Sequence, residues 1–114
     1  MIAVIFEFTP KSGTRDIYLD IAAEMRPLAE GIDGFISVER FQSITNPEKM
    51  LSVSVWRDED AVREWRNLAA HRSAQKRGRE TLFSDYRLRV AGILRDYSLL
   101  DREDAPDDSR STHG

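Results

Sequence analysis

The sequence contains no cysteine, which excludes disulfides, thiolate metal sites and cysteine nucleophiles. No apolar run approaches the ~18 residues of a membrane-spanning helix, so we expect no membrane association. Lys and Arg balance Asp and Glu within residues 1–100, which leaves no strongly basic face for nucleic acid. The apolar N-terminus lacks the basic region and the cleavage site of a signal peptide, and we interpret it as a strand. Together these absences favour a cytoplasmic protein.

The chain has 114 residues, 40% of them hydrophobic and 32% charged, which is the balance of a single globular domain. The segment 101–114 differs, because it carries five Asp/Glu against two Arg and no large apolar side chain. Such a segment cannot bury enough apolar surface to offset its ordering entropy. We therefore predict a domain over residues 1–98 and a polar, acidic, disordered tail over residues 99–114.

Hydrophobic periodicity predicts strands over residues 2–9, 35–44, 50–57 and 86–97. It predicts one helix over residues 14–30, a second from Asp58 to about Gly78, and a short helical segment over residues 79–85. The apolar stripe expected on the first helix consists of Ile17, Ile21, Met25, Leu28 and Ile32. The main order is β-α-β-β-α-β, which is the ferredoxin-like split βαβ arrangement of the α+β class.

The first predicted strand is largely apolar on both faces. Its alternating residues place Ile2, Val4, Phe6 and Phe8 on one face and Ala3, Ile5, Glu7 and Thr9 on the other. Two helices cover only one face of a four-stranded sheet. A second copy of the sheet is the simplest cover for the other face, so we predict a homodimer through the sheet face.

The segment 56–75, WRDEDAVREWRNLAAHRSAQ, holds both tryptophans and the only histidine outside the tail. It predicts a strand that ends at Trp56 and a helix that carries Trp65 and His71. In an uninterrupted helix, residues six apart lie roughly 120° from one another. Trp65 and His71 therefore share a pocket only if the helix bends or ends near residues 69–70.

These residues resemble the antibiotic biosynthesis monooxygenase family over about residues 1–98. The resemblance rests on Gly34 and Phe35 at the entry of a strand, on Trp56 before an acidic helix start, and on Trp65 followed by His71. It implies a dimeric α+β barrel. It also implies a small oxygenase that oxidises an electron-rich aromatic, a phenol or a quinol, with dioxygen and without metal, flavin or other cofactor.

The resemblance implies an aromatic-walled pocket with a His or Arg near the phenolate and a hydrogen-bonding Tyr. The implied catalytic residues are His71, Trp65, Arg40 and Tyr86. The resemblance adds Trp56 and Phe83 as pocket walls. Gln75, which follows His71 by four residues on the same helix face, and Glu7 complete the predicted substrate pocket. The basic cluster Arg72, Lys76, Arg77 and Arg79 is interpreted as a solvated helix face.

Each of these residues also has a structural interpretation. His71 fits a structural or surface histidine, Trp65 a core residue, and Trp56 an anchor of the dimer. Arg40 fits a salt bridge with a carboxylate, and Tyr86 fits packing with a solvated hydroxyl. Glu7 acts as a base with a raised pKa if it is buried, or lies in solvent if its strand is at the edge of the sheet.

A haem-degrading branch of the family provides a second hypothesis. That branch requires an Asn on the first strand, the helix Trp, and a haem-ligating His ten residues after that Trp. Here the tenth residue after Trp65 is Gln75, and no Asn precedes Asn46. The sequence therefore disfavours haem as a cofactor. A third hypothesis is a non-catalytic dimer that binds a small molecule.

Overall fold

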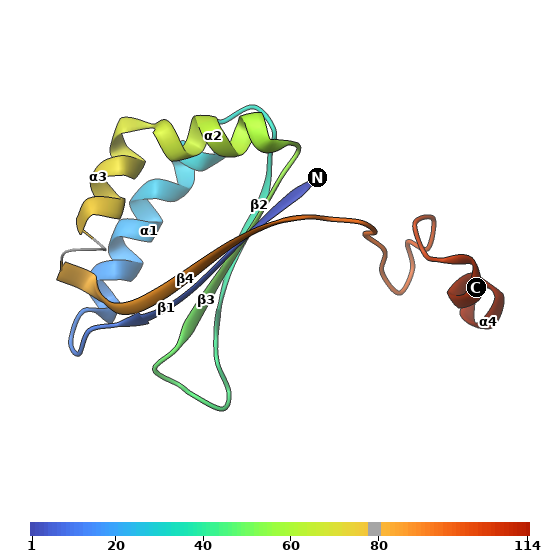
Figure 1. Cartoon of the computed structure of the whole chain (residues 1–114), viewed down its shortest axis with the longest axis horizontal. Coiled ribbons are helices and arrows are strands. Elements are labelled where there is room, and N and C mark those ends of the chain that lie inside the picture. The colour runs from blue at the N-terminus through green and yellow to red at the C-terminus, as the bar shows by residue number, and fades with distance from the viewer. Residues whose placement is uncertain (78–80) are drawn as a thin grey trace.

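The computed structural model describes residues 1–77 and 81–114 (Figure 1). Its domain is built on an open, four-stranded antiparallel sheet in the order β2-β3-β1-β4. The elements are β1 (Ile2–Pro10), α1 (Arg15–Glu30), β2 (Phe35–Gln42), β3 (Met50–Trp56), α2 (Glu59–Asn67), α3 (Ala69–Arg77), β4 (Phe83–Gly92) and α4 (Asp107–His113). The helices α1, α2 and α3 lie on one side of the sheet, so the predicted ferredoxin-like α+β fold is confirmed (Figure 1).

Strand register decides which side chains face the helices. In β1, Phe8 pairs with Met50 of β3 and with Tyr86 of β4, and Ile2 pairs with Trp56. Paired residues project to the same face of an antiparallel sheet. The helix-facing side of β1 therefore carries Ile2, Val4, Phe6 and Phe8, which the sequence placed together on one face. The opposite side of the sheet, called the open face below, carries Ile5, Glu7, Leu51, Val53, Arg87 and Arg89.

The face of α1 that is buried against the sheet differs from the apolar stripe that the sequence predicts. Its buried residues are Tyr18, Ala22 and Ala29, whereas Ile17 and Leu28 are 43% and 40% exposed. The prediction was wrong for these two residues because periodicity ranks side chains by hydropathy alone. Tyr18 instead turns inward onto Phe8, with ring centroids 4.4 Å apart, and the small alanines let the helix approach the sheet.

A break separates α2 from α3 at Leu68. Asp58 caps the start of α2 by accepting a hydrogen bond of 2.9 Å from the Ala61 amide. Leu68 has extended backbone angles, φ −61° and ψ 130°, so the helix stops there and a new one starts at Ala69. This is the interruption that the pairing of Trp65 with His71 requires.

Three predicted boundaries are corrected. The strand expected to end at residue 44 ends at Gln42, and the last strand covers Phe83–Gly92 where residues 86–97 were predicted. The short helix expected over residues 79–85 was wrong from Phe83 onward, because Pro10 of β1 pairs with Phe83 and draws it into the sheet. Gly78 and Arg79 lie outside the described residues. Among the described residues, no helix is both long and apolar enough to cross a membrane.

The C-terminal segment, residues 93–114, is called the C-terminal arm below. Residues 93–97 lie beyond the last strand, and residues 99–114, the predicted tail, include the short helix α4. Arg102 donates hydrogen bonds to the Gly114 carbonyl at 2.8 Å and to Ser109 Oγ at 2.7 Å, and its guanidinium lies 5.0 Å from the Tyr97 ring centroid. Hydrophobicity missed this organisation because one polar side chain with five donors provides it. In Figure 1 the arm extends away from the sheet and helices.

Candidate functional site

An aromatic stack joins β2, β3, α2 and α3 on the helix-facing side of the sheet. Phe35 meets Trp56 edge-on with ring centroids 5.3 Å apart, and Trp56 stacks with Trp65 at 6.1 Å. Trp65 in turn stacks with His71 at 4.2 Å, the two planes lying 20° from parallel. We call these residues the Trp–His stack. The break at Leu68 brings its last two members together.

His71 is half-buried and held at a defined nitrogen. Its Nδ1 lies 2.9 Å from the carbonyl oxygen of Trp65. A carbonyl oxygen only accepts, so Nδ1 carries the proton and Nε2 carries the lone pair. Burial lowers the pKa of His71 below its ordinary value, and the bond to the Trp65 carbonyl opposes that shift only in part. At neutral pH the group is therefore a neutral imidazole with a proton-accepting Nε2.

Trp56 belongs to the core rather than to a pocket wall or a dimer contact. Its side chain is 1% exposed, and its indole N–H donates to Ser54 Oγ at 2.9 Å. Ala29, Ile32, Ala61 and Val62 surround it on the same side of the sheet. Trp56 thus lies in the core of the single chain, where α1 and α2 close over the end of β3.

A second aromatic group lies towards the other end of the same face. Phe83 has its ring centroid 5.1 Å from Phe8, 5.7 Å from Tyr18 and 6.3 Å from Tyr86. Arg40 of β2 joins the group, since its Nε donates to the Tyr18 hydroxyl at 3.2 Å. The expected carboxylate partner of Arg40 is thus replaced by a phenol. Arg40 and Phe83 both contact Tyr18, a residue that the sequence prediction did not select, whereas Tyr86 contacts Phe83 from β4 at the other edge of the sheet.

The helices leave the helix-facing side of β4 uncovered. Tyr86, Leu88 and Val90 pair with Phe8, Phe6 and Val4, so they project towards the helix layer. They are nevertheless 43%, 50% and 47% exposed. We call these three residues the β4 shelf. Sequence alternation placed Leu88 and Val90 on one face, but their exposure depends on where the helices lie.

Glu7 is separated from the other predicted site residues whose side chains the structure describes. It lies on the open face of β1, which is an inner strand of the sheet. Glu7 is therefore neither a buried base nor a residue of an edge strand. Its carboxylate lies 3.4 Å from Lys49 Nζ and 3.5 Å from an Arg89 guanidinium nitrogen. Partial burial acts to raise its pKa, but these two cations outweigh that effect and lower it. The raised pKa that the sequence analysis attached to a buried Glu7 therefore does not apply.

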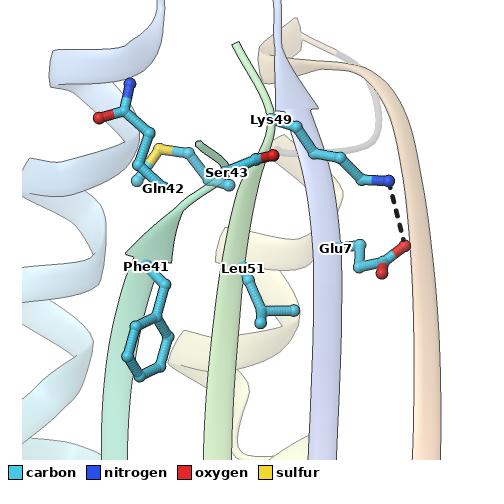
Figure 2. A pocket seen from close by; sticks show the side chains of 7 residues that line it. Glu7, Phe41, Gln42, Ser43, Lys49 and Leu51 are labelled. Carbon is cyan, nitrogen blue, oxygen red and sulfur yellow. Dashed lines mark ion pairs between the residues drawn. The ribbon is translucent and has the colours of Figure 1, made fainter. Parts of the chain in front are cut away.

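A hollow of about 290 Å³ lies beside Glu7 at the end of the β2–β3 hairpin. Figure 2 shows Phe41, Leu51 and Glu7 projecting from three neighbouring strands, on the side of the sheet away from the helices. Its lining residues are Glu7, Phe41, Gln42, Ser43, Lys49, Met50 and Leu51. The hollow is thus on the face opposite the Trp–His stack. The side chain of Gln75, the remaining predicted pocket residue, lies outside the described part of α3.

Comparisons with known proteins agree with this architecture. A family model described as "Antibiotic biosynthesis monooxygenase" matches residues 1–77. The "Jasmonate monooxygenase ABM" of Pyricularia oryzae is 45% identical over 93 residues, which are 82% of this chain and 43% of that protein. The chain therefore spans less than half the length of this relative.

Solved structures share the fold at low sequence identity. Rv0793 from Mycobacterium tuberculosis matches with a TM-score of 0.75 at 21% identity, over 85% of this chain and 98% of that one. SnoaB, a cofactor-independent oxygenase from Streptomyces nogalater, matches with a TM-score of 0.72 at 13% identity, over 83% of this chain and 94% of that one. At these identities the likeness concerns the fold alone.

Proposed function

We propose that this chain, which belongs to the antibiotic biosynthesis monooxygenase family, oxidises a small electron-rich molecule with dioxygen and without a cofactor. The preferred substrate class is a phenol or a quinol. The observation that carries the proposal is the pairing of Trp65 with His71. It places a neutral imidazole of fixed tautomer against an indole, on the same face as an uncovered apolar shelf.

His71 acts as the general base in this proposal. Its Nε2 takes the phenolic proton, and the phenolate passes one electron to dioxygen. The resulting aryloxyl radical and superoxide combine to form a carbon–oxygen bond on the substrate. Loss of water then leaves a carbonyl group. One oxygen atom enters the substrate and the other leaves as water, so the substrate supplies all the electrons and no external reductant is consumed.

The surrounding residues bind and shield the anion. Trp65 provides an aromatic wall, and the β4 shelf provides an apolar floor that excludes water from one side of the substrate. Arg40 supplies positive charge to the phenolate, since its contact with Tyr18 takes only one of five guanidinium N–H groups. Tyr86 offers its hydroxyl as a hydrogen-bond donor, and Phe83 packs behind it.

Jasmonate is a second candidate substrate, favoured by the 45% identical relative named as a jasmonate monooxygenase. Jasmonate has a ketone, and removal of a proton beside the ketone gives an electron-rich enolate. His71 would serve this substrate by the same proton transfer. Arg40 would then contact its carboxylate.

The proposal includes a homodimer through the open face. Ile5, Leu51 and Val53 on this face are only partly covered within one chain, and Phe41 is 46% exposed. A second sheet packed against this face would remove that apolar surface from water. The Trp–His stack would remain on the outer side, beneath the helices.

Oxygen consumption tests the proposed activity. Purified, metal-free protein is mixed with a panel of phenols, quinols and jasmonate in an oxygen electrode, and products are identified by mass spectrometry. The expected result is uptake of one dioxygen per product and a mass increase of about 14, because the substrate gains one oxygen and loses two hydrogens as water forms. Failure of the whole panel, in protein that is folded, would contradict the proposal.

A further inference from the structure

Three leucines of the C-terminal arm have almost no cover within their own chain. Leu94, Leu99 and Leu100 are 89%, 89% and 91% exposed. Beside Leu99 and Leu100, Arg102 donates hydrogen bonds to Ser98, Ser109 and the terminal Gly114. A segment that presents adjacent apolar side chains to water has the character of an interaction surface.

The hollow on the open face provides a matching surface. Phe41 and Leu51 form its apolar part, and Phe41 is 46% exposed (Figure 2). Its volume of about 290 Å³ is large enough to receive a pair of leucine side chains. Phe41 and Leu51 are neighbours across β2 and β3, so this apolar patch is contiguous.

Charge is complementary between the acidic arm and the cations beside the hollow. Lys49, Arg87 and Arg89 lie around the carboxylate of Glu7, and the open face also carries Glu39, which pairs with Val53, and Asp85, which pairs with Thr9. The arm carries Asp96 and Asp101 on either side of Leu99 and Leu100, and residues 101–114 hold five Asp/Glu against two Arg. Opposite potentials of this kind select a partner and fix its register.

We propose that the C-terminal arm of one copy docks on a second copy of the chain, with Leu99 and Leu100 in the hollow and the arm's acidic residues facing Lys49 and Arg87. This inference rests on the proposed homodimer and goes beyond it, because the arm adds a contact that sheet packing does not require. In a symmetric pair each copy gives one arm and receives one.

Topology favours docking on a second copy over docking on the arm's own chain. The arm begins after Gly92, which pairs with Ile2 at one end of β1, whereas the hollow lies beside Glu7 towards the other end. The arm then extends away from its own sheet (Figure 1). From Gly92 to Leu100 an extended chain spans about 26 Å, at roughly 3.3 Å per residue, which is enough to cross a neighbouring sheet.

Cysteine cross-linking in the full-length chain tests the contact, because the natural sequence has no cysteine. A Leu100→Cys variant is mixed with a mass-tagged Ser43→Cys variant under mild oxidation, since Ser43 lines the hollow. The matched control is a mixture of Leu100→Cys with Ser73→Cys, an exposed position on α3 in the helix layer. We expect a disulfide-linked heterodimer with Ser43→Cys and little or none with Ser73→Cys.

Sedimentation velocity on the wild type and on Leu99→Asp/Leu100→Asp separates this inference from the dimer itself. We expect the double variant to raise the dimer dissociation constant at least about tenfold, while Ile17→Asp on the outer surface of α1 leaves it unchanged. A wild-type monomer would overturn both the dimer and the arm contact. A dimer that neither cross-links at Ser43 nor weakens in the double variant would overturn the arm contact alone. A disulfide within one chain in dilute Ser43→Cys/Leu100→Cys would also overturn it.

Discussion

His71 lies flat against Trp65 and also bonds to its backbone, with ring centroids 4.2 Å apart and Nδ1 2.9 Å from the Trp65 carbonyl oxygen. One residue thus positions the imidazole through both its side chain and its main chain. The helix break at Leu68 makes this possible, because Trp65 lies in the last turn of α2 and His71 in the first turn of α3. The arrangement fixes which imidazole nitrogen accepts a proton.

The two tryptophans have different roles, and replacing each with alanine is expected to lower the free energy of unfolding by different amounts. Trp56 is 1% exposed, so Trp56→Ala is expected to lower the free energy of unfolding by about 3–5 kcal/mol. Trp65 is only partly buried at the edge of the core, and Trp65→Ala is expected to cost less, roughly 1–3 kcal/mol. Urea denaturation followed by circular dichroism measures both. Equal losses would contradict the assignment of Trp56 to the core and of Trp65 to the site.

The lowered pKa of His71 predicts a contribution to acid destabilisation. Above about pH 6.5 the imidazole is neutral in both the folded and the unfolded chain, so it adds no pH dependence. As the pH falls below that value, the unfolded chain binds the proton first, and the free energy of unfolding decreases. The decrease is complete once the pH is below the lowered folded-state pKa.

His71→Asn provides the matched comparison, because an Asn amide can replace the Nδ1–H donor but does not titrate. Urea unfolding at several pH values between 4 and 8 is expected to show a weaker acid dependence for this variant. Identical pH profiles for the wild type and His71→Asn would contradict the burial of a neutral imidazole.

Two glycines with positive φ predict unequal costs for alanine. At Gly34, with φ +96°, a Cβ would lie 2.9 Å from the Ala61 Cβ. At Gly13, with φ +79°, nothing lies within 4 Å of the added atom. We expect Gly13→Ala to cost ~1–2 kcal/mol from backbone strain alone, and Gly34→Ala to cost clearly more because α2 must also move. Thermal unfolding of both variants compares them, and similar melting temperatures would refute the close approach of α2 to Gly34.

We predict that the wild-type chain does not bind haem. With Gln75 ten residues after Trp65 and no Asn on the first strand, we expect hemin titration to give no shifted Soret band. The comparison variant is Gln75→His, which introduces the imidazole that the haem-degrading branch has at that position. A ligated haem spectrum from the wild-type chain would revive the haem hypothesis.

The sequence predicted the element order well because strand alternation, helix periodicity and turn residues are local signals. It also identified the need for a helix interruption between Trp65 and His71. It did not predict the rotation of α1, since the inward position of Tyr18 depends on Phe8 and Arg40, which come from other elements. For the same reason it grouped Glu7 with Arg40 and Tyr86, although Glu7 lies on the opposite face of the sheet.

Glu7 illustrates the limit most clearly. Its alternation within β1 was predicted correctly, but its environment depends on Lys49 and Arg89, which the register of two neighbouring strands brings beside it. The contacts of Arg102 with Ser109 and Gly114 in the C-terminal arm are likewise not encoded in any hydrophobic periodicity.

The central claim is that the Nε2 atom of His71 removes the substrate proton. Oxygen-uptake rates of the wild type, His71→Asn and Trp65→Phe with the same active substrate test it most directly. We expect kcat of His71→Asn to fall by roughly 10²–10⁴-fold, while Trp65→Phe, which keeps the backbone carbonyl and an aromatic ring, retains most of its rate. A His71→Asn variant that consumes oxygen at the wild-type rate would contradict the account.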